Sequence, residues 1–420
     1  MPKKRKKPEK RKTAHPPQKR PKPPGRKGRP SLKLIPPASP PFDDAPSLDY
    51  LPLPSGPPPT LSLLRRMENE FERALDRPKV SVVIVNHDGV DFLWHCLFAL
   101  KTQTYPLHEV ILVDNASEDA SLDFVKTNYP LVKVIECQEN FGYAMGCNLG
   151  SKIATGDLVV LLNNDAVVTP DWLQRMIEDF QEHWPKTGVL ASSVKSNKGG
   201  VEKGGLENGT LNFLGNPVAG FFEDPRTVFY PEGCALMVPK FLIAEEPFDP
   251  DYFIYQEDVY LGWKFRLAGK QVRKSSGARV FHEPGGTMSR FQGWKTVYYQ
   301  TRNRWMNLFL FYGSADLLKV LPWVAAEALV RMARSLGVGF DSFLGTLFAI
   351  LWIASHPLAI IRKRRILQEK RKVRDGEIVR FMSGRVARDG GWISRCLNFL
   401  SLLYCLVVGL EVMEFPRDKN

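Results

Sequence analysis

The sequence lacks the cysteine patterns of a metal-binding or disulfide-bonded protein. Its 420 residues contain six cysteines, and no two of them form a CxxC pair. We therefore expect no zinc site, and the scattered cysteines suit a reducing compartment. No apolar stretch follows the basic amino-terminal residues, so we also expect no secretory signal peptide.

The sequence also lacks the glycine-rich loops with which two large enzyme classes bind phosphate. No GxxxxGK[ST] segment occurs, and no GxGxxG follows the first predicted strand. These absences argue against a P-loop hydrolase and against a dinucleotide oxidoreductase. What remains possible for a nucleotide-binding enzyme is a site built on carboxylates.

The excess positive charge is confined to one end of the chain. Of the formal net charge of +13, the first 33 residues supply fifteen Lys or Arg against one acid, so the remainder carries −1. Residues 1–60 are rich in Lys and Pro and have little to bury, which predicts a disordered tail. Simple solvation is one interpretation of this tail; contact with anionic lipid or RNA and a nuclear-import signal are alternatives. We expect no nucleic-acid partner for the rest of the chain.

Residues 78–313 show the alternation of a parallel α/β domain. Short β-branched runs alternate with helical patterns of ten or more residues, which is typical of βαβ units. The four predicted strands are KVSVVIVN, EVILVDN, VKVIEC and LVVLL. An amphipathic helix in residues 61–77 leads into this domain, and residues 314–420 form a separate helical region.

Polar side chains follow three of these strands. Asn86 ends the first, Asp114 ends the second, and Asn163, Asn164 and Asp165 follow the fourth. An isolated Asn-Asn-Asp triplet is more often a turn. Because ligands of open α/β sheets bind at the carboxyl ends of strands, three such ends together predict a nucleotide-binding crevice.

Several acids and one histidine could carry the chemistry of this crevice. Asp114 could accept hydrogen bonds from a base or ribose, and Asp165 could hold a divalent cation against diphosphate oxygens. Glu257 and Asp258 precede a predicted helix, where acids are also common caps. His282 lies at the end of a predicted strand, before a predicted Pro-Gly turn, and a lone histidine is more often a core or surface residue.

The order and spacing of these segments resemble glycosyltransferase family 2, most closely its rhamnosyltransferase-like branch. The resemblance covers residues 79–312 and rests on seven consecutive segments: SVVIVNHDG, ILVDNAS, NFGYAMGCNLG, LVVLLNNDAVVTPDWL, GCALMVPK, QEDVYLGWKFRLAG and RVFHEPGG. It implies a GT-A fold with a mainly parallel central sheet. It further implies inverting transfer from a nucleoside-diphosphate sugar linked to dTDP, UDP or GDP.

By the same resemblance, individual residues receive roles. Asp258 is the expected general base, with Glu257 beside it, and Asp165 and His282 are the expected ligands of a Mg²⁺ or Mn²⁺ cofactor. The expected donor-binding residues are Asn86, Asp114, Asn140, Gly142, Asn148, Asn163, Asn164 and Asp165.

The sequence departs from the family pattern in the helix that follows the acid pair. Tyr260 replaces a second acid, and Gly262 replaces a bulkier residue. The later segment YYQTRNRW matches a family segment in which Arg302 and Arg304 could lie near phosphate. A plain helix-surface role for these arginines is an equal alternative.

The region after residue 313 suggests a membrane. Residues 343–361 carry no formal charge over nineteen residues, and residues 362–395 hold twelve basic against four acidic residues. Nineteen apolar residues can span a bilayer. Because nucleotide sugars and basic loops both belong in the cytosol, we favour a re-entrant or interfacial segment over a span. A buried helical subdomain or an oligomer interface is the alternative.

The sequence therefore predicts a metal-dependent inverting glycosyltransferase at the cytoplasmic face of a bacterial cell membrane, bound peripherally or monotopically to its anionic surface. Its acceptor would be a hydroxyl of a cell-surface glycan or a lipid-linked molecule, and its sugar rhamnose or another hexose. The competing hypothesis is a catalytically degenerate GT-A scaffold whose basic tail binds nucleic acid or anionic membrane. The complete set of Asp114, Asp165, Asp258 and His282 argues against it.

Overall fold

The computed structural model describes residues 60–196, 203–204, 209–219, 222–244, 246–282, 293–387 and 391–414. All of them belong to one compact unit, Ser55–Asn420. Except for Thr60, the predicted tail of residues 1–60 lies outside the described residues, and so does the turn predicted after His282.

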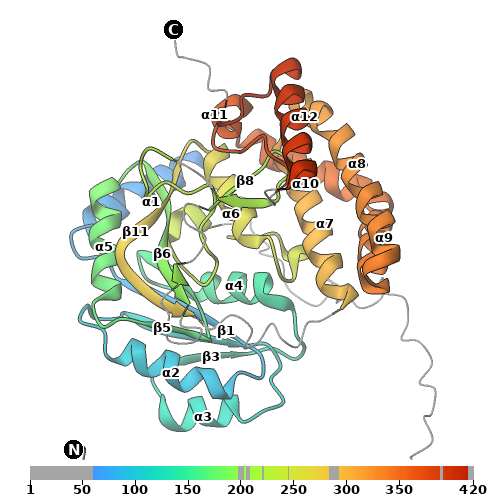
Figure 1. The fold of residues 1–420 in the computed structure, drawn as a ribbon. Helices are drawn as coiled ribbons and strands as arrows, with labels where there is room; N and C mark the ends of the chain where they lie inside the picture. Colours follow the sequence, from blue (N-terminus) through green and yellow to red (C-terminus); the bar gives the residue numbers. More distant parts are fainter. Residues whose placement is uncertain are drawn as a thin grey trace, which may run out of the picture. The chain divides into compact units, whose positions relative to one another are not determined.

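A nine-stranded mixed sheet organises the described chain (Figure 1). Its order is β3-β2-β1-β4-β10-β6-β11-β5, and β7 pairs with β6. Strands β1 to β4, β6 and β11 share one direction, while β5, β7 and β10 run against it. This confirms the predicted α/β class and the mainly parallel sheet. The strands are β1 (Val80–Asn86), β2 (Glu109–Asp114), β3 (Lys133–Glu136), β4 (Leu158–Asn163), β5 (Ala166–Val168), β6 (Thr187–Ser196), β7 (Lys203–Gly204), β10 (Ala235–Pro239) and β11 (Gln271–His282), with a separate hairpin of β8 (Gly209–Leu211) and β9 (Pro217–Ala219).

Helices cover both faces of the sheet because its central strands are apolar on both sides. Val83, Ile111 and Val159 face one core, which includes α4, α6 and α7. Val82 and Val160 face the other core, which includes α1, α2 and α5. The helices are α1 (Leu61–Ala74), α2 (Val90–Lys101), α3 (Ser121–Asn128), α4 (Gly142–Ile153), α5 (Trp172–His183), α6 (Glu257–Leu267), α7 (Trp294–Phe311), α8 (Ser314–Val338), α9 (Phe340–Ser355), α10 (Pro357–Glu369), α11 (Asp375–Val379) and α12 (Trp392–Val408).

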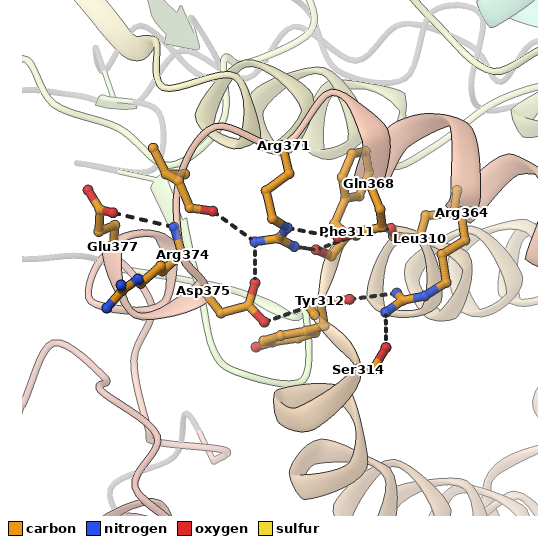
Figure 2. Close-up of polar contacts among 12 residues, drawn as sticks. Leu310, Phe311, Tyr312, Ser314, Arg364, Gln368, Arg371, Arg374, Asp375 and Glu377 are labelled. Carbon is orange, nitrogen blue, oxygen red and sulfur yellow. Dashed lines mark hydrogen bonds and ion pairs between the residues drawn. The ribbon is translucent and has the colours of Figure 1, made fainter.

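The helices after α7 pack on the α/β part of the chain (Figure 1). Side chains of α10 and of the segment after it satisfy the last carbonyls of α7, which a helix leaves without internal partners. Arg364 donates to the carbonyl of Phe309 at 2.6 Å and to that of Tyr312 at 2.5 Å. Gln368 donates to the carbonyls of Leu310 and Phe311 at 2.8 and 3.1 Å; Figure 2 shows Arg364 and Gln368 beside Leu310, Phe311 and Tyr312. Cationic groups at this end also complement the helix dipole. The end of α7 therefore depends on α10 for its hydrogen bonds.

The apolar segment of residues 343–361 does not form one helix. Pro357 begins α10, where its missing N–H costs nothing, and the chain bends by 75° between α9 and α10. Within the described ranges no single helix has the length and apolarity of a membrane span, although α9 and α10 together reach them.

Two of the four basic residues that follow this segment are engaged within the protein. Lys363 binds Asp249 and Asp251 at 2.5 Å each, and Arg364 binds the end of α7. Lys363 and Arg364 of this basic segment therefore bind groups of the protein itself. Arg362 and Arg365 are exposed.

Candidate functional site

The parallel strands bring the predicted polar residues to one edge of the sheet. β1, β2 and β4 end at Asn86, Asp114 and Asn163, and the register pairs Asn86 directly with Asp114. β11 runs in the same direction as these strands and ends at His282, which pairs with Ala166 of β5. Segments separated by about two hundred residues in sequence thus meet at one edge.

Asp165 and His282 lie side by side at this edge. Nε2 of His282 is 3.1 Å from Oδ1 of Asp165, but the contact lacks hydrogen-bond geometry and this buried oxygen has no hydrogen-bond partner. A carboxylate oxygen beside an imidazole nitrogen suits a divalent cation whose remaining ligands are water and substrate phosphate. No group of three or more His, Cys, Asp or Glu suited to a metal occurs in the part of the chain that the structure describes. Asp165 and His282 could thus supply two protein ligands to such an ion.

Asp114 is buried in a small polar network. Its carboxylate accepts hydrogen bonds from the hydroxyl and backbone N–H of Ser117 at 2.5 and 3.0 Å and from the amide of Asn86 at 3.2 Å. The amide of Asn164 donates to Oδ1 of Asn86 at 2.8 Å. This network links the ends of three strands. Sequence reasoning missed Ser117, although a hydroxyl three residues after a strand-end Asp is a common local hydrogen-bonding pattern.

The start of α4 borders the same edge. The backbone N–H of Gly142 donates to Oδ1 of Asn140 at 2.9 Å, and the amide of Asn115 donates to the carbonyl of Gly142 at 3.0 Å. Gly142 has φ +82°, and a Cβ there would lie 2.6 Å from the ring and the carbonyl oxygen of Phe253. Only glycine combines this conformation with this contact.

Asn148 lies away from the strand ends. Its side-chain amide donates to the carbonyl of Phe248 at 2.9 Å and accepts from the backbone N–H of the same residue at 3.1 Å. These bonds link α4 to the segment that precedes Glu257 and Asp258. In this structure Asn148 therefore joins two parts of the fold.

Glu257 and Asp258 open α6 after a loop of unusual backbone conformation. Phe253, Tyr255 and Gln256 have φ values of 53°, 69° and 68°. Non-glycine residues in the left-handed region are uncommon and are often found at functional sites. The loop presents both acids at the cavity described below.

Burial shifts the proton affinity of both acids in the same direction. Removal from water raises the pKa of Asp258 above its usual range, although the carboxylate accepts a hydrogen bond from the N–H of Val259 at 2.7 Å. Burial and the nearby charge of Asp258 raise the pKa of Glu257, whose Oε2 has no hydrogen-bond partner. A carboxylate with a raised pKa is a stronger base at neutral pH.

Asn303 of α7 holds the loop in place. Its buried side-chain amide donates to the carbonyls of Tyr252, Ile254 and Tyr255 at 2.8, 2.9 and 2.8 Å. These bonds satisfy three backbone carbonyls in and beside the loop that contains the left-handed residues. Sequence reasoning missed Asn303; the available signal was an amide between two arginines on a largely apolar helix.

The arginines beside Asn303 are both buried, so the helix-surface alternative is wrong for both. The guanidinium of Arg302 lies over the ring of Trp352 at 4.8 Å and donates to the carbonyl of Asp251. Arg304 donates to the carbonyl of Leu214 at 2.8 Å and lines the cavity.

The two departures from the family pattern also have packing explanations. Tyr260 is buried against Tyr252 and Phe311, with ring centroids 5.2 and 5.1 Å apart, so an acid there would be buried in the core. A Cβ on Gly262 would lie 2.6 Å from the Cα of Tyr230, which leaves room only for glycine.

A cavity of about 750 Å³ unites most of these groups. The predicted residues that line it are Asn140, Gly142, Asn163, Asn164, Asp165, Glu257, Asp258 and His282, whereas Asn86, Asp114 and Asn148 are not among the lining residues. Six lining side chains carry a buried polar atom without a hydrogen-bond partner: His87 Nδ1, Asn163 Oδ1, Asp165 Oδ1, Gln256 Oε1, Glu257 Oε2 and Arg304 Nη2. Because such atoms are costly and rare, their concentration here indicates a site for a polar ligand.

Comparison with known proteins agrees with this geometry. Residues 81–243 match the family model described as glycosyl transferase family 2. The chain is 26% identical over 221 residues to an O-antigen biosynthesis protein, RfbC, from Myxococcus xanthus, covering 49% of this chain and 17% of the relative. It is also 26% identical over 238 residues to an N-acetylglucosaminyl-diphospho-decaprenol L-rhamnosyltransferase from Mycobacterium tuberculosis, covering 50% of this chain and 77% of the relative.

Among solved structures, the S. aureus protein TarS is similar with a TM-score of 0.46 and 18% sequence identity. The similarity covers 70% of this chain and 52% of that protein.

Proposed function

Residues 81–243 form a glycosyltransferase family 2 domain, and from this premise we propose that the chain is an inverting glycosyltransferase. It moves a sugar, rhamnose or another hexose, from a nucleoside-diphosphate sugar to a hydroxyl of a cell-surface glycan or lipid-linked acceptor. The observation that carries the proposal is one cavity that is lined by Asp165, His282, Glu257 and Asp258. Six polar atoms of its lining side chains are buried without a hydrogen-bond partner.

The donor is assigned to the strand-end side of the cavity. Asn140, Asn163 and Asn164 line this side and offer amide groups to a nucleotide. Asp114 and Asn86 support these residues from behind through the Asn164 contact. Their proposed role is to position the donor-binding side chains.

Asp258 is the proposed general base. An acceptor hydroxyl is a weak nucleophile, so a carboxylate that accepts its proton assists attack on the anomeric carbon. The new bond forms on the face opposite the leaving diphosphate, which inverts the anomeric configuration. The half-buried position of Asp258 favours this role because desolvation raises its pKa.

Asp165 and His282 are the proposed ligands of a Mg²⁺ or Mn²⁺ ion. When bound, such an ion would stabilise the negative charge of the diphosphate leaving group. The protein's own contribution is to hold an unpartnered carboxylate oxygen and an imidazole nitrogen together at the edge of the cavity.

A panel of dTDP-, UDP- and GDP-linked sugars tests the proposal. Purified full-length protein should release nucleoside diphosphate from one donor when a suitable acceptor is present. EDTA and Asp165→Ala should each abolish the release, while Lys126→Ala, a change at an exposed position, should not. Undiminished turnover in EDTA would remove the cation from the mechanism, and no donor binding at all would contradict the proposed activity.

We also propose that the protein binds the cytoplasmic membrane surface through its carboxyl-terminal helices. Trp392, Phe399 and Val407 of α12 are 75%, 66% and 76% exposed, an unusual exposure for large apolar side chains. The exposed Arg362 and Arg365 of α10 supply positive charge for anionic headgroups.

A further inference from the structure

The helical wall of the cavity contains a cluster of two arginines that the proposed reaction does not use. Arg304 of α7 and Arg331 of α8 both line the cavity. Among the lining residues that the structure describes, they are the ones with a formal positive charge, whereas Asp165, Glu232, Glu257 and Asp258 are acidic. The two arginines lie after residue 243, beyond the match to the family model.

Glu327 of α8 holds the two guanidinium groups together. Its Oε2 accepts a hydrogen bond from Nη1 of Arg304 at 2.8 Å, and its Oε1 accepts one from Nε of Arg331 at 2.9 Å. One carboxylate faces two guanidinium groups, so the cluster keeps a net positive charge. Asn216 completes the arrangement, because its Oδ1 lies 3.4 Å from Nη2 of Arg331.

One hydrogen-bond donor of the cluster has no partner, which is a property expected of a binding site. Arg304 is 3% exposed, yet its buried Nη2 makes no hydrogen bond. A buried guanidinium N–H without an acceptor is costly unless a ligand supplies one. Two guanidinium groups from different helices suit a tetrahedral oxyanion, since several oxygens can then be bound at once.

We propose that Arg304 and Arg331 form a subsite for a phosphate or diphosphate group carried by the acceptor. The residues assigned to the donor lie at the strand ends and the start of α4, whereas this subsite belongs to the loop at Asn216 and to α7 and α8. An anion bound there is therefore best placed for the second substrate. Only the assignment of that anion to an acceptor rests on the proposed glycosyl transfer.

Titration calorimetry with inorganic pyrophosphate in EDTA tests the subsite without turnover. Full-length wild-type protein should bind, and Arg331→Gln should weaken binding about tenfold because a charge-assisted hydrogen bond is lost. Arg334→Gln, an exposed arginine on the same helix, is the matched control and should bind like wild type. Asp165→Ala should also bind like wild type, since the donor side is not involved.

Equal affinities for Arg331→Gln and Arg334→Gln would overturn the subsite. Loss of binding in Asp165→Ala would instead assign pyrophosphate to the donor side and overturn the proposal as well. Competition by farnesyl phosphate or by glucose 1-phosphate distinguishes lipid-borne from sugar-borne phosphate. Displacement by either supports the assignment to an acceptor, and displacement by neither contradicts it. Because no step needs a donor sugar, these outcomes remain interpretable if glycosyl transfer itself is not found.

Discussion

At the scale of single residues, the acid pair shows how a site can work against stability. Glu257 and Asp258 are half-buried beside each other, and partial removal from water raises the pKa of both. A folded state that binds protons more tightly than the unfolded chain loses stability as pH rises through that range. The same placement supplies a base of suitable strength near neutral pH.

The assignment of the base predicts a difference between the two acids. Asp258→Asn keeps the size of the side chain but cannot accept a proton, so kcat should fall about 10²–10⁴-fold. Donor affinity should change little, because the donor residues are intact. Steady-state kinetics and donor titration measure both effects. If Glu257→Gln were the crippling change and Asp258→Asn mild, the roles within the pair would be reversed.

The raised pKa of Glu257 predicts a pH-dependent gain in stability on its removal. Above the usual pKa of a glutamate, the unfolded chain releases this proton more readily than the folded protein does, so wild type loses stability as pH rises. Glu257→Gln should therefore raise the free energy of unfolding by roughly 1–2 kcal/mol at high pH, with little gain near pH 4.

Denaturant titrations at several pH values measure this gain. Glu178→Gln, on the exposed face of α5, is the control and should show no such trend. A gain for Glu257→Gln that is the same at every pH would show that the carboxyl group titrates normally.

At the scale of elements, α7 connects the left-handed loop before α6 to the carboxyl-terminal helices. Asn303 binds the left-handed loop from one side of the helix, and Arg304 forms part of the cavity wall. The last carbonyls of α7 are bound by side chains of α10 (Figure 2). One helix thus determines where the acid pair lies and depends on later residues for its own end.

The Asn303 contacts predict a catalytic effect without direct contact with substrate. Asn303→Ala removes three hydrogen bonds from the loop, and a displacement of the base by about 1 Å can cost roughly 10²-fold in rate. We expect kcat to fall by that order and donor affinity to change little.

Leu310→Ala is the matched control, because Leu310 is buried on the same helix and its carbonyl accepts a hydrogen bond from Gln368 of α10. Both variants should lose stability, but only Asn303→Ala should lose kcat at a temperature where both are folded. An equal fall in kcat for the two would reduce the role of Asn303 to general packing.

The end of α7 predicts unequal effects of two neighbouring arginines. Arg364→Ala leaves two carbonyls of this helix end without that partner and should lower the free energy of unfolding by about 1.5–3 kcal/mol. Arg365, whose side chain is 83% exposed, pairs with Glu369 on the same helix, so Arg365→Ala should cost less than about 0.5 kcal/mol. Thermal and denaturant unfolding distinguish the two; equal losses would contradict a capping role.

At the scale of the whole molecule, the carboxyl-terminal region is joined to the α/β domain. The boundary predicted at residue 313 separates segments that pack on each other and share ion pairs, among them Lys363 with Asp249. Truncation after Gly313 would remove these contacts, so it is a poor test of membrane binding. Substitutions on the exposed face of α12 test membrane binding without removing them.

The exposed face of α12 predicts membrane binding that point changes can weaken. Trp392→Ser, Phe399→Ser and Val407→Ser together should reduce flotation with vesicles of phosphatidylglycerol and phosphatidylcholine, because apolar burial is lost. Leu131→Ser, at a residue 94% exposed on the α/β domain, is the control. Binding should weaken with salt and on vesicles of phosphatidylcholine alone. Wild-type protein that does not float with the phosphatidylglycerol-containing vesicles at low salt would contradict the membrane proposal.

The sequence by itself determined the class of the fold and the family. Strands β1 to β4 were predicted because a buried parallel strand needs an apolar run, and the run ends where polar residues begin. The match of residues 81–243 confirmed the predicted family. Eight of the predicted site residues line one cavity, and four of them, Asn163, Asn164, Asp165 and His282, do so because strand ends of one direction share an edge.

The tertiary structure alone decided which groups surround that edge. Asn148 fits the family segment, yet its amide is bound to Phe248, a hundred residues away. Arg331 lies on a helix whose local sequence gives no reason to place it near the site, and the partners of Asn303 lie about fifty residues earlier in the chain. Local sequence fixes hydrogen-bonding capacity and periodicity, but the partner of a buried polar group depends on long-range packing, which no local pattern contains.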